Sequence, residues 1–479
     1  MQDKNSDVYD VIIIGGGPAG MICAGKCAER GARVILLEKN DVLGKKLLIT
    51  GGGRCNLTNS EFDTRKFLAK FKDDGKYLFS AFSQHGVQDT LDFFHKKGMP
   101  TKVENFLRTF PESDRSQSVL DVLVQYMKNS GGKGNVHVLS NSKVIDVLVD
   151  VLVDESKQKA SKANEVEEKT GVSQRKVSAV KLENGKIIKG KSIVIATGGA
   201  SHPETGSTGD GFIWLKKLGH KVIDPKPSLV PIAIKEKWVK ELSGFSLENV
   251  KVTVFTSFAS ELGQPSESSE PGGSSESGTV NNSTKKHFSK IGKILFTHFG
   301  LSGPTILNMS KGIDELLSAP SHTTSPAKKV EIQIDLLPKE DYGMLNSKLQ
   351  NLFKINHKKI LRNTLGEIIP NTVVLAVIEI AKIDGTKECN SITKEERQSL
   401  ISTIKGMPMT VTGLLDVDKA IITSGGVILD EVDFKTMRSR LFSNLYLIGD
   451  VLNIDRPSGG FSLQICWTTG FVAGDHVEI

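Results

Sequence analysis

Residues 45–59, KKLLITGGGRCNLTN, bring three consecutive glycines together with an arginine, a cysteine and two asparagines. Three interpretations fit these residue types: a phosphate cradle, a thiol active site, or a tight turn. Arg54 carries forked donors that bind a phosphate or a carbonyl oxygen, and its charge can lower the pKa of Cys55 and favour a thiolate. Packing of Cys55 against a bound molecule is the alternative, and Asn56 fits a turn or cap as well as a ligand contact.

A nucleotide-binding pattern precedes this stretch, in residues 9–39. A buried apolar run, a glycine turn, a helical stretch and a second apolar run predict a βαβ unit. Gly15, Gly17 and Gly20 form GxGxxG, which provides a tight turn, room for a pyrophosphate and close helix–strand contact. Glu38 ends the second strand, where a carboxylate accepts hydrogen bonds from ribose hydroxyls. The unit therefore predicts dinucleotide binding, with the phosphates at the start of the helix.

Composition and charge limit the class of protein. The chain has 479 residues, a formal net charge of +7 and five cysteines. The lysines lie in polar stretches rather than in one basic run with aromatic residues, so no nucleic-acid partner is expected. The odd cysteine count predicts no disulfide framework, and the absence of clustered Cys and His motifs predicts no metal site.

Targeting signals are also absent from the sequence pattern. The N-terminal residues have neither signal-peptide nor transit-peptide character, and the apolar runs are too short to span a membrane. We therefore expect a cytoplasmic protein without a membrane partner, and an organelle form stays open. The pattern predicts no particular oligomeric state.

The order of the patterns along the chain predicts a discontinuous arrangement. Strand and glycine signals at both ends predict one domain from residues 1–205 and 406–479, with a hairpin turn at Asn184-Gly185. Residues 206–340 read as a β-rich insertion. Its polar stretch 257–288 is expected to be a disordered loop. Leucines and isoleucines at helical spacing predict a small helical domain at 341–405.

Several motifs, taken in order, resemble one known family. They are the residue 45–59 stretch with the preceding glycine, TFPESDRSQSVLDVL, ILFTHFGLSGPTIL, ITSGGV and the C-terminal GD segment. Together they resemble the BaiN-like family of NAD(P)/FAD-dependent oxidoreductases, also called aminoacetone oxidase family FAD-binding enzymes, nearly end to end. The resemblance implies an α/β fold: a glutathione-reductase-type FAD-binding Rossmann domain with an inserted β-barrel-like domain and a small helical domain.

The resemblance also implies a set of FAD contacts. The glycine fingerprint meets the pyrophosphate, Glu38 meets the adenosine ribose, and the GGGRCN stretch lies near the flavin. The glycine loop before the last helix leads to free N–H groups that can face negative charge on a reduced flavin. The expected cofactor-binding residues are Gly15, Gly17, Pro18, Ala19, Gly20, Glu38, Lys39, Lys46, Gly53, Arg54, Cys55, Asn56, Thr197, Gly198, Gly449, Asp450, Gly459, Gly460 and Phe461.

This chain departs from the family pattern at three of its C-terminal positions. The family commonly has glutamate where Asp450 stands, glycine near Arg456 and asparagine near Ser462. Aspartate still accepts a hydrogen bond, with a shorter reach. Arg456 adds bulk and charge, which alters the expected shape of the substrate face.

The predicted activity follows from flavin chemistry, in which the cofactor carries the hydride and the protein positions it. No second GxGxxG follows a strand, so NAD(P)H, the expected donor, has no Rossmann domain of its own. The expected catalytic residues are Arg54, Cys55 and His298, the last as a proton donor or simply as a hydrogen-bonded turn histidine.

We predict an FAD-dependent oxidoreductase that passes hydride, from NAD(P)H, to a small organic substrate. Both the reductase type and the amine oxidase type stay open. The alternatives are an FAD-dependent tRNA-modifying enzyme and a flavin-binding interaction protein without turnover.

Overall fold

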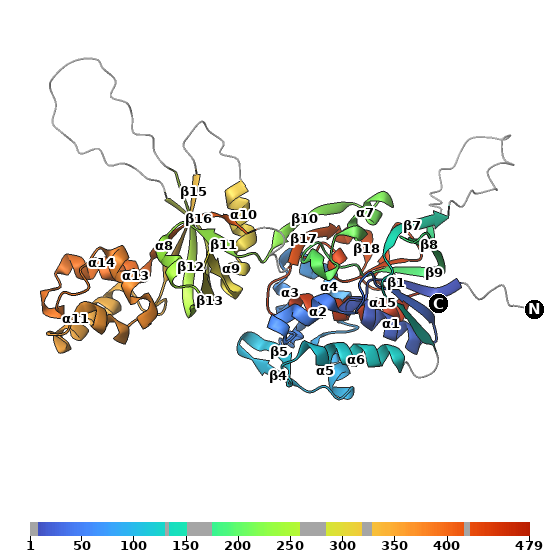
Figure 1. Ribbon diagram of the computed structural model, residues 1–479, viewed down its shortest axis with the longest axis horizontal. Helices are drawn as coiled ribbons and strands as arrows, with labels where there is room; N and C mark the ends of the chain where they lie inside the picture. The colour runs from blue at the N-terminus through green and yellow to red at the C-terminus, as the bar shows by residue number, and fades with distance from the viewer. Residues whose placement is uncertain (1–7, 130–133, 151–174, 259–283, 319–327, 416–421) are drawn as a thin grey trace, which may run out of the picture. The chain divides into compact units, whose positions relative to one another are not determined.

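The computed structural model describes residues 8–129, 134–150, 175–258, 284–318, 328–415 and 422–479 (Figure 1). Contacts between residues divide the chain into two compact units. Unit 1 contains Met1–Pro227 and Ile421–Ile479, and unit 2 contains Ser228–Ala420. Among the helices of the described ranges, none is long and apolar enough to cross a membrane.

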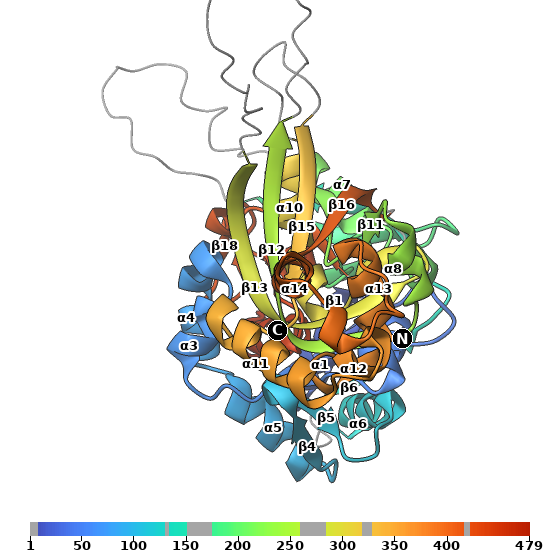
Figure 2. The same cartoon turned by 90° about the vertical axis from the view of Figure 1, so that its left-hand side faces the viewer.

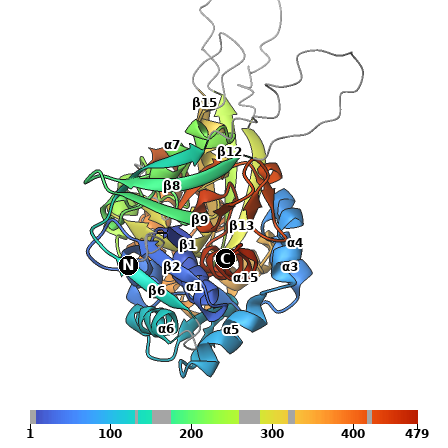
Figure 3. The same cartoon turned by 90° about the vertical axis from the view of Figure 1, so that its right-hand side faces the viewer.

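Unit 1 is built on a sheet with the strand order β18-β19-β20-β9-β1-β2-β6, to which β8 and β7 add beyond β9. Its parallel centre consists of β1 (Val8–Ile14), β2 (Arg33–Leu37), β6 (Asn135–Leu139), β9 (Ile187–Ile195) and β20 (Leu445–Leu447). The apolar runs of β1 and β2 are buried, as expected for strands covered on both faces. Figure 3 shows these strands with α1 (Pro18–Glu29) and α15 (Phe461–His476) beside them.

The remaining elements of unit 1 surround this sheet. Its other helices are α2 (Lys45–Ile49), α3 (Thr64–Ala69), α4 (Gly75–Phe82), α5 (Val87–Lys96), α6 (Ser116–Lys128) and α7 (Asp210–Lys217). Its other strands are β3 (Thr58–Asn59), β4 (Thr101–Glu104), β5 (Arg108–Pro111), β7 (Val144–Asp150), β8 (Lys176–Leu182), β10 (Val222–Ser228), β17 (Ile422–Val427), β18 (Val432–Asp433) and β19 (Arg438–Ser439). The expected hairpin at Asn184-Gly185 joins the antiparallel pair β8–β9 and is confirmed.

Helices α1 and α15 of unit 1 approach each other closely. A Cβ added at Gly470 of α15 would lie 2.5 Å from the carbonyl oxygen of Ala19 and 2.4 Å from the Ile22 side chain. Only glycine allows this approach of helix backbone to helix backbone. The contact holds the C-terminal helix against the helix of the GxGxxG unit, so residues from both ends of the chain reach one place.

Unit 2 contains a closed barrel with the strand order β11-β14-β13-β12-β15-β16. The barrel strands are β11 (Ile232–Ile234), β12 (Ser246–Phe258), β13 (Thr284–Thr297), β14 (Gly300–Ser302), β15 (Lys328–Asp335) and β16 (Met407–Leu414). The helices are α8 (Lys237–Glu241), α9 (Pro304–Leu307), α10 (Ser310–Ser318), α11 (Tyr342–Ile355), α12 (Leu361–Thr364), α13 (Asn371–Ala381) and α14 (Lys394–Lys405). Figure 2 shows the long strands β12, β13 and β15 together with α11–α14.

Several expected boundaries differ from this structure. The boundary at residue 205 is wrong because α7 contacts β7 and β17, and β10 pairs with β17, which keeps these elements in unit 1. The boundary at 406 is wrong because β16 closes the barrel by pairing with β11 and β15. These pairings are made between distant segments, so a local pattern does not reveal them.

The inserted unit also differs from the prediction in how its helices group and in the length of its loop. The helices from residues 341–405 share one apolar core with the barrel and lie in the same compact unit, rather than in a separate helical domain. The expected disordered loop 257–288 extends too far, because β12 continues to Phe258 and β13 begins at Thr284. The rest of that loop lies outside the described residues.

A buried histidine in unit 1 predicts a pH dependence of stability. His85 is 3% exposed, its ring stacks on Phe471 with centroids 4.2 Å apart, and burial lowers its pKa to about 4. The unfolded chain takes up this proton near pH 6.5, whereas the folded chain does not until about pH 4, so stability falls as pH decreases through this window. At pH 5 the loss is about 2 kcal/mol.

Urea unfolding at pH 7.5 and pH 5.0 measures this effect. His85→Phe, which keeps a stacked ring, should lose less stability between the two pH values than the wild type does. The exposed His357→Gln is the matched control and should behave like the wild type. Equal pH dependence in His85→Phe and wild type would contradict the assignment.

Candidate cofactor-binding site

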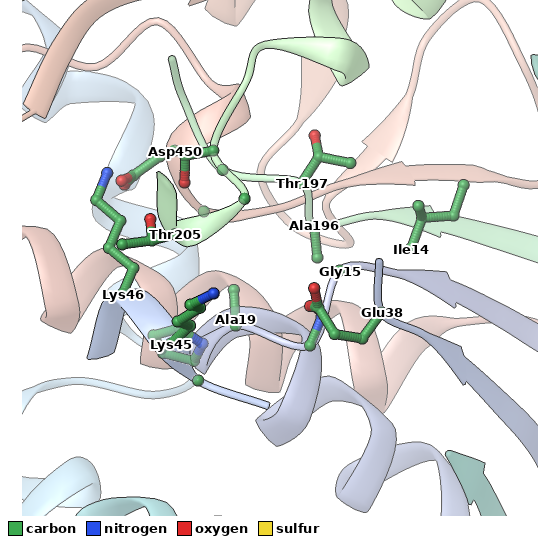
Figure 4. A pocket seen from close by; sticks show the side chains of 18 of the residues that line it. Ile14, Gly15, Ala19, Glu38, Lys45, Lys46, Ala196, Thr197, Thr205 and Asp450 are labelled. Carbon is green, nitrogen blue, oxygen red and sulfur yellow. The ribbon is translucent and has the colours of Figure 1, made fainter. Parts of the chain in front are cut away.

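A large pocket opens in unit 1 at the carboxyl ends of β1, β2 and β9. Its cavity volume is about 200 Å³, and it extends from the start of α1 to the first turn of α15. Ligands of open α/β sheets bind at this edge. Figure 4 shows Glu38 beside Gly15 at one end of the pocket, and Lys46 with Asp450 at the other. The expected cofactor residues that line it are Gly15, Gly17, Pro18, Ala19, Glu38, Lys39, Lys46, Thr197, Gly198, Gly449 and Asp450.

The three fingerprint glycines have different physical reasons to be glycine. Gly15 has φ +110°, and an added Cβ would lie 2.4 Å from the Ala196 carbonyl oxygen. A Cβ at Gly20 would lie 2.0 Å from the Gly15 carbonyl oxygen. A Cβ at Gly17, in contrast, would meet nothing within 4 Å. Gly15 and Gly20 therefore serve the fold, whereas Gly17 leaves open space toward the pocket.

The start of α1 offers its amide groups to a ligand. Gly17 is the N-cap residue, and no side chain caps the helix there. The first N–H groups of a helix have no partner within the helix, and the helix dipole places positive charge at this end. This end of the pocket suits a phosphate group.

Glu38 is fixed in place by the backbone around it. Its side chain is buried, Oε2 accepts from the Gly16 N–H at 2.7 Å, and Oε1 accepts from the N–H and Nδ2 of Asn40 at 2.8 Å each. Asn40 Nδ2 also donates to the Thr205 carbonyl oxygen at 3.0 Å. The carboxylate thus ties the glycine turn to the far wall of the pocket.

The other end of the pocket carries charged groups. Lys46 Nζ donates to Ser201 Oγ at 2.7 Å, and burial lowers the pKa of this lysine, an effect that the charge of Asp450 opposes. Lys39, which follows Glu38, forms an ion pair with Asp210 at 2.8 Å. Lysines and carboxylates therefore both line the pocket, and the free amides at the start of α1 are the groups best suited to a phosphate.

The GGGRCN stretch lies apart from the pocket lining. Arg54 donates from Nε to Asp114 Oδ1 at 2.8 Å, forms a second ion pair with Glu104, and stacks on the Phe110 ring at 4.2 Å. These contacts direct the guanidinium to β4 and β5. The expected contact of Arg54 with phosphate or flavin carbonyl stays a prediction, and it requires the arginine to share or leave these carboxylates.

The surroundings of Cys55 favour packing over activation of its thiol, and its expected catalytic role stays a prediction. The thiol is fully buried, and burial raises the pKa of Cys55 to about 12. The positive charge of Arg54 does not produce a thiolate because Glu104 and Asp114 neutralise it. Cys55 has φ +61°, so this residue forms part of the tight turn.

This environment predicts slow reaction of the cysteines with thiol reagents. All five cysteines are buried and free. At pH 8 the thiolate fraction of Cys55 is about 10⁻⁴ from its raised pKa, and access is blocked as well. We expect almost no labelling by Ellman's reagent within minutes in the native protein and five equivalents in guanidinium chloride. Rapid labelling at Cys55, located by peptide mapping, would contradict this.

The glycine loop before α15 is held by the same stretch. The Asn56 amide accepts from the Gly460 N–H at 3.0 Å and donates to the Thr58 carbonyl oxygen at 3.2 Å. A Cβ at Gly460, which has φ +98°, would lie 2.3 Å from the Thr58 carbonyl carbon. The Gly460 N–H is thus engaged within the protein, and the pocket is reached instead by Ser462, Leu463 and Cys466 of the first turns of α15.

The remaining expected residues also lie away from the lining. Gly20, Gly53, Gly459 and Phe461 are not among the lining residues, and Phe461 packs on Phe67 with ring centroids 4.8 Å apart. His298 is exposed in the turn between β13 and β14 of unit 2, edge-on to the Phe299 ring. Its role as a proton donor stays a prediction.

Several pocket residues were not expected from the sequence. They come from different connecting segments and from α2 and α7, and they are Asn40, Lys45, Ser142, Thr205, Asp210 and Trp214. The polar run TGSTGD, residues 205–210, which lies in the loop after β9 and leads into α7, was the one available signal. A loop that leaves the carboxyl end of a central parallel strand lies at the ligand edge of the sheet.

Together, the βαβ unit, its open glycine at the start of α1 and the buried Glu38 define a dinucleotide-binding Rossmann protein. The family described as "HI0933-like protein Rossmann domain" matches residues 9–147 and 135–476. The chain belongs to this family of FAD-binding oxidoreductases, which confirms the resemblance derived from its motifs.

The chain is similar to curated proteins over its full length. It is 27% identical to "Ribosomal RNA dihydrouridine synthase" of Escherichia coli (strain K12), over 98% of both chains. It is 25% identical to "3-dehydro-bile acid delta(4,6)-reductase" of Clostridium scindens, over 96% of this chain and 97% of the relative. A 3-ketosteroid-delta4-(5alpha)-dehydrogenase from Rhodococcus jostii RHA1 aligns in structure with a TM-score of 0.46 and 12% identity, over 99% and 98% of the two chains.

Proposed function

We propose that this protein binds FAD in the unit 1 pocket and uses it to reduce a carbon–carbon double bond conjugated to a carbonyl group, with NAD(P)H as the donor. The observation that carries the proposal is the pocket itself, which combines uncapped helix amides, an open Gly17 and a fixed Glu38 carboxylate. FAD, when bound, supplies the hydride chemistry.

The residues of the pocket have separate roles in this proposal. The amides at the start of α1 hold the pyrophosphate, Glu38 accepts from the adenosine ribose, and Asp450 accepts from the ribityl chain. The first turn of α15 directs its dipole toward the flavin end. We also assign the FAD domain to the glutathione-reductase type, supported by the meeting of both chain ends at one pocket.

The substrate class is inferred from two relatives. Their names describe a reductase of a bile acid and a synthase of dihydrouridine in ribosomal RNA. A dihydrouridine is a uridine whose ring double bond, conjugated to a carbonyl, has gained two hydrogens. A small unsaturated carbonyl compound is our first candidate. A uracil in RNA is the second, favoured by the dihydrouridine synthase names of two relatives.

The experiment follows the flavin spectrum of the purified protein without oxygen. NADH, NADPH and primary amines are added in turn, and we expect bleaching of the oxidised band by a nicotinamide but not by amines. The reduced protein then receives either an unsaturated ketone or a uracil-containing ribosomal RNA fragment. Return of the oxidised band identifies the acceptor.

The other outcomes have definite meanings. Bleaching by amines alone would indicate the amine oxidase type. Reoxidation by RNA but by no small compound would overturn the small-molecule candidate and support the RNA candidate. Flavin that is bound but never reduced would contradict the proposed activity and favour an interaction protein. Purified protein that neither carries nor takes up FAD would contradict the whole proposal.

A further inference from the structure

We propose that Arg456 is the positioning residue for Asp450. It fixes one oxygen of this carboxylate, leaves the other for the cofactor, and offsets a negative charge that would otherwise repel the cofactor phosphates. The inference rests on the proposed binding of FAD.

Arg456 is buried and its guanidinium closes a loop. The residue is 3% exposed, and Nη1 lies 2.9 Å from Asp450 Oδ1. Nη2 lies 3.3 Å from the carbonyl oxygens of Gly449 and Leu452, to which it donates. One planar group thus holds the backbone before and after Asp450 as well as its carboxylate. A lysine would keep the charge but not this forked geometry.

Asp450 is held from one side only. Its Oδ1 atom accepts from Arg456 Nη1 and also from the Ser462 hydroxyl of α15, at 3.4 Å. Within the described part of the chain, Oδ2 has no hydrogen-bond partner, although the side chain is only 17% exposed and lines the pocket. A carboxylate oxygen in such a place normally has a partner. A ligand hydroxyl would satisfy it.

The charges around this carboxylate explain why an arginine is needed. The charge of Asp450 alone would disfavour a ligand that carries phosphates. Lys46 lines the pocket beside Asp450, and Arg456 pairs with the same carboxylate from outside the pocket lining, so two basic groups oppose one acidic group. Removing Arg456 would leave a partly buried carboxylate with weaker compensation of its charge, which is costly for the site.

A purely structural role is the competing explanation, since Arg456 also ties the loop together. The two explanations differ in whether the effect of Arg456 on FAD affinity depends on the residue at position 450. If Arg456 acts through Asp450, its effect on FAD affinity disappears when Asp450 carries no charge. If it only supports the loop, its effect is the same with either residue at position 450. A double-mutant cycle measures this difference.

The experiment measures FAD affinity of the full-length apoprotein for wild type, Arg456→Met, Arg456→Lys, Asp450→Asn and the double variant Arg456→Met/Asp450→Asn. We expect Arg456→Met to weaken binding about 30-fold and Arg456→Lys about 3-fold. In the Asp450→Asn background, Arg456→Met should change the affinity by less than about 3-fold. Thermal unfolding of each apoprotein accompanies the titrations.

Arg30→Met is the matched control. Arg30 Nη1 also donates to two carbonyl oxygens, of Gly474 at 3.0 Å and of Val477 at 2.8 Å, but at the far end of α15. This variant should lower the unfolding temperature without weakening FAD binding.

Equal weakening by Arg456→Met in both backgrounds would overturn the inference while leaving FAD binding intact. If Arg456→Met does not fold, the cycle is built with Arg456→Gln, which removes the charge but keeps an amide donor for the loop carbonyls, and the same loss of effect in the Asp450→Asn background is expected. Wild-type protein that does not bind FAD would overturn the proposed function, and this inference with it.

Discussion

Gly17→Val is expected to abolish most of the FAD affinity while leaving the apoprotein folded. Gly17 has an extended backbone with φ −80°, and an added Cβ meets no protein atom within 4 Å. The space is open in the protein and would be filled by the pyrophosphate at the start of α1. Overlap of a branched side chain with the ligand should weaken binding about 100-fold, or ~3 kcal/mol. The loss of apoprotein stability should stay near 1 kcal/mol, because valine is a poorer N-cap than glycine.

Titration of the apoprotein with FAD measures the affinity, and thermal unfolding measures stability. Gly413→Val is the control, since Gly413 in β16 also has open space around an added Cβ and lies in unit 2. It should leave both quantities unchanged. Wild-type affinity in Gly17→Val would show that the phosphates lie elsewhere and would refute the proposed orientation of the cofactor.

Glu38→Gln is expected to have the second-largest effect, on affinity and stability together. Both oxygens of Glu38 accept from N–H groups, of Gly16 and Asn40. A glutamine amide can accept through only one end, so its NH₂ group would face one of these donors. An unsatisfied buried donor costs about 1–3 kcal/mol. We expect that loss in urea unfolding and a weakening of FAD binding by about 30-fold, because a charge-assisted bond to the ribose is also lost.

The control for this variant is Glu183→Gln, whose exposed carboxylate pairs with Lys143 on the surface. It should change stability by less than about 1 kcal/mol and leave the affinity unchanged. A further readout is displacement of FAD by ADP, which shares the adenosine half. Unchanged ADP binding in Glu38→Gln would contradict the placement of the ribose at Glu38.

Much of the fold was predictable where the signals are local. The βαβ unit of residues 9–39 forms as expected, and its strands pair in parallel. The sequence predicted an inserted barrel-like domain, but it did not predict the residues at which this domain begins and ends. β16 follows a helical region and precedes a strand of unit 1, so nothing in its own residues assigns it to the barrel.

The candidate site also contains residues that local patterns place correctly and residues whose position depends on distant partners. Glu38, Gly15 and Gly17 lie where their spacing predicts, because strand, turn and helix fix these positions within about 25 residues. Arg54 was expected near the cofactor from its neighbours in sequence. Its carboxylate partners Glu104 and Asp114 are 50 and 60 residues away, and their charges decide where its guanidinium lies.

The sequence by itself determined that the N-terminal unit is a βαβ unit of the dinucleotide-binding type, because glycine conformation and strand–helix spacing are local properties. Only the tertiary structure decided that carboxylates neutralise Arg54 and that one oxygen of Asp450 stays available to a ligand. Burial raises the pKa of Cys55. The fold places Lys46 in the pocket lining near Asp450, and it places Arg456 against the same carboxylate from outside the lining. Burial and charge pairing depend on contacts between segments far apart in the chain, so residue type and spacing alone do not contain them.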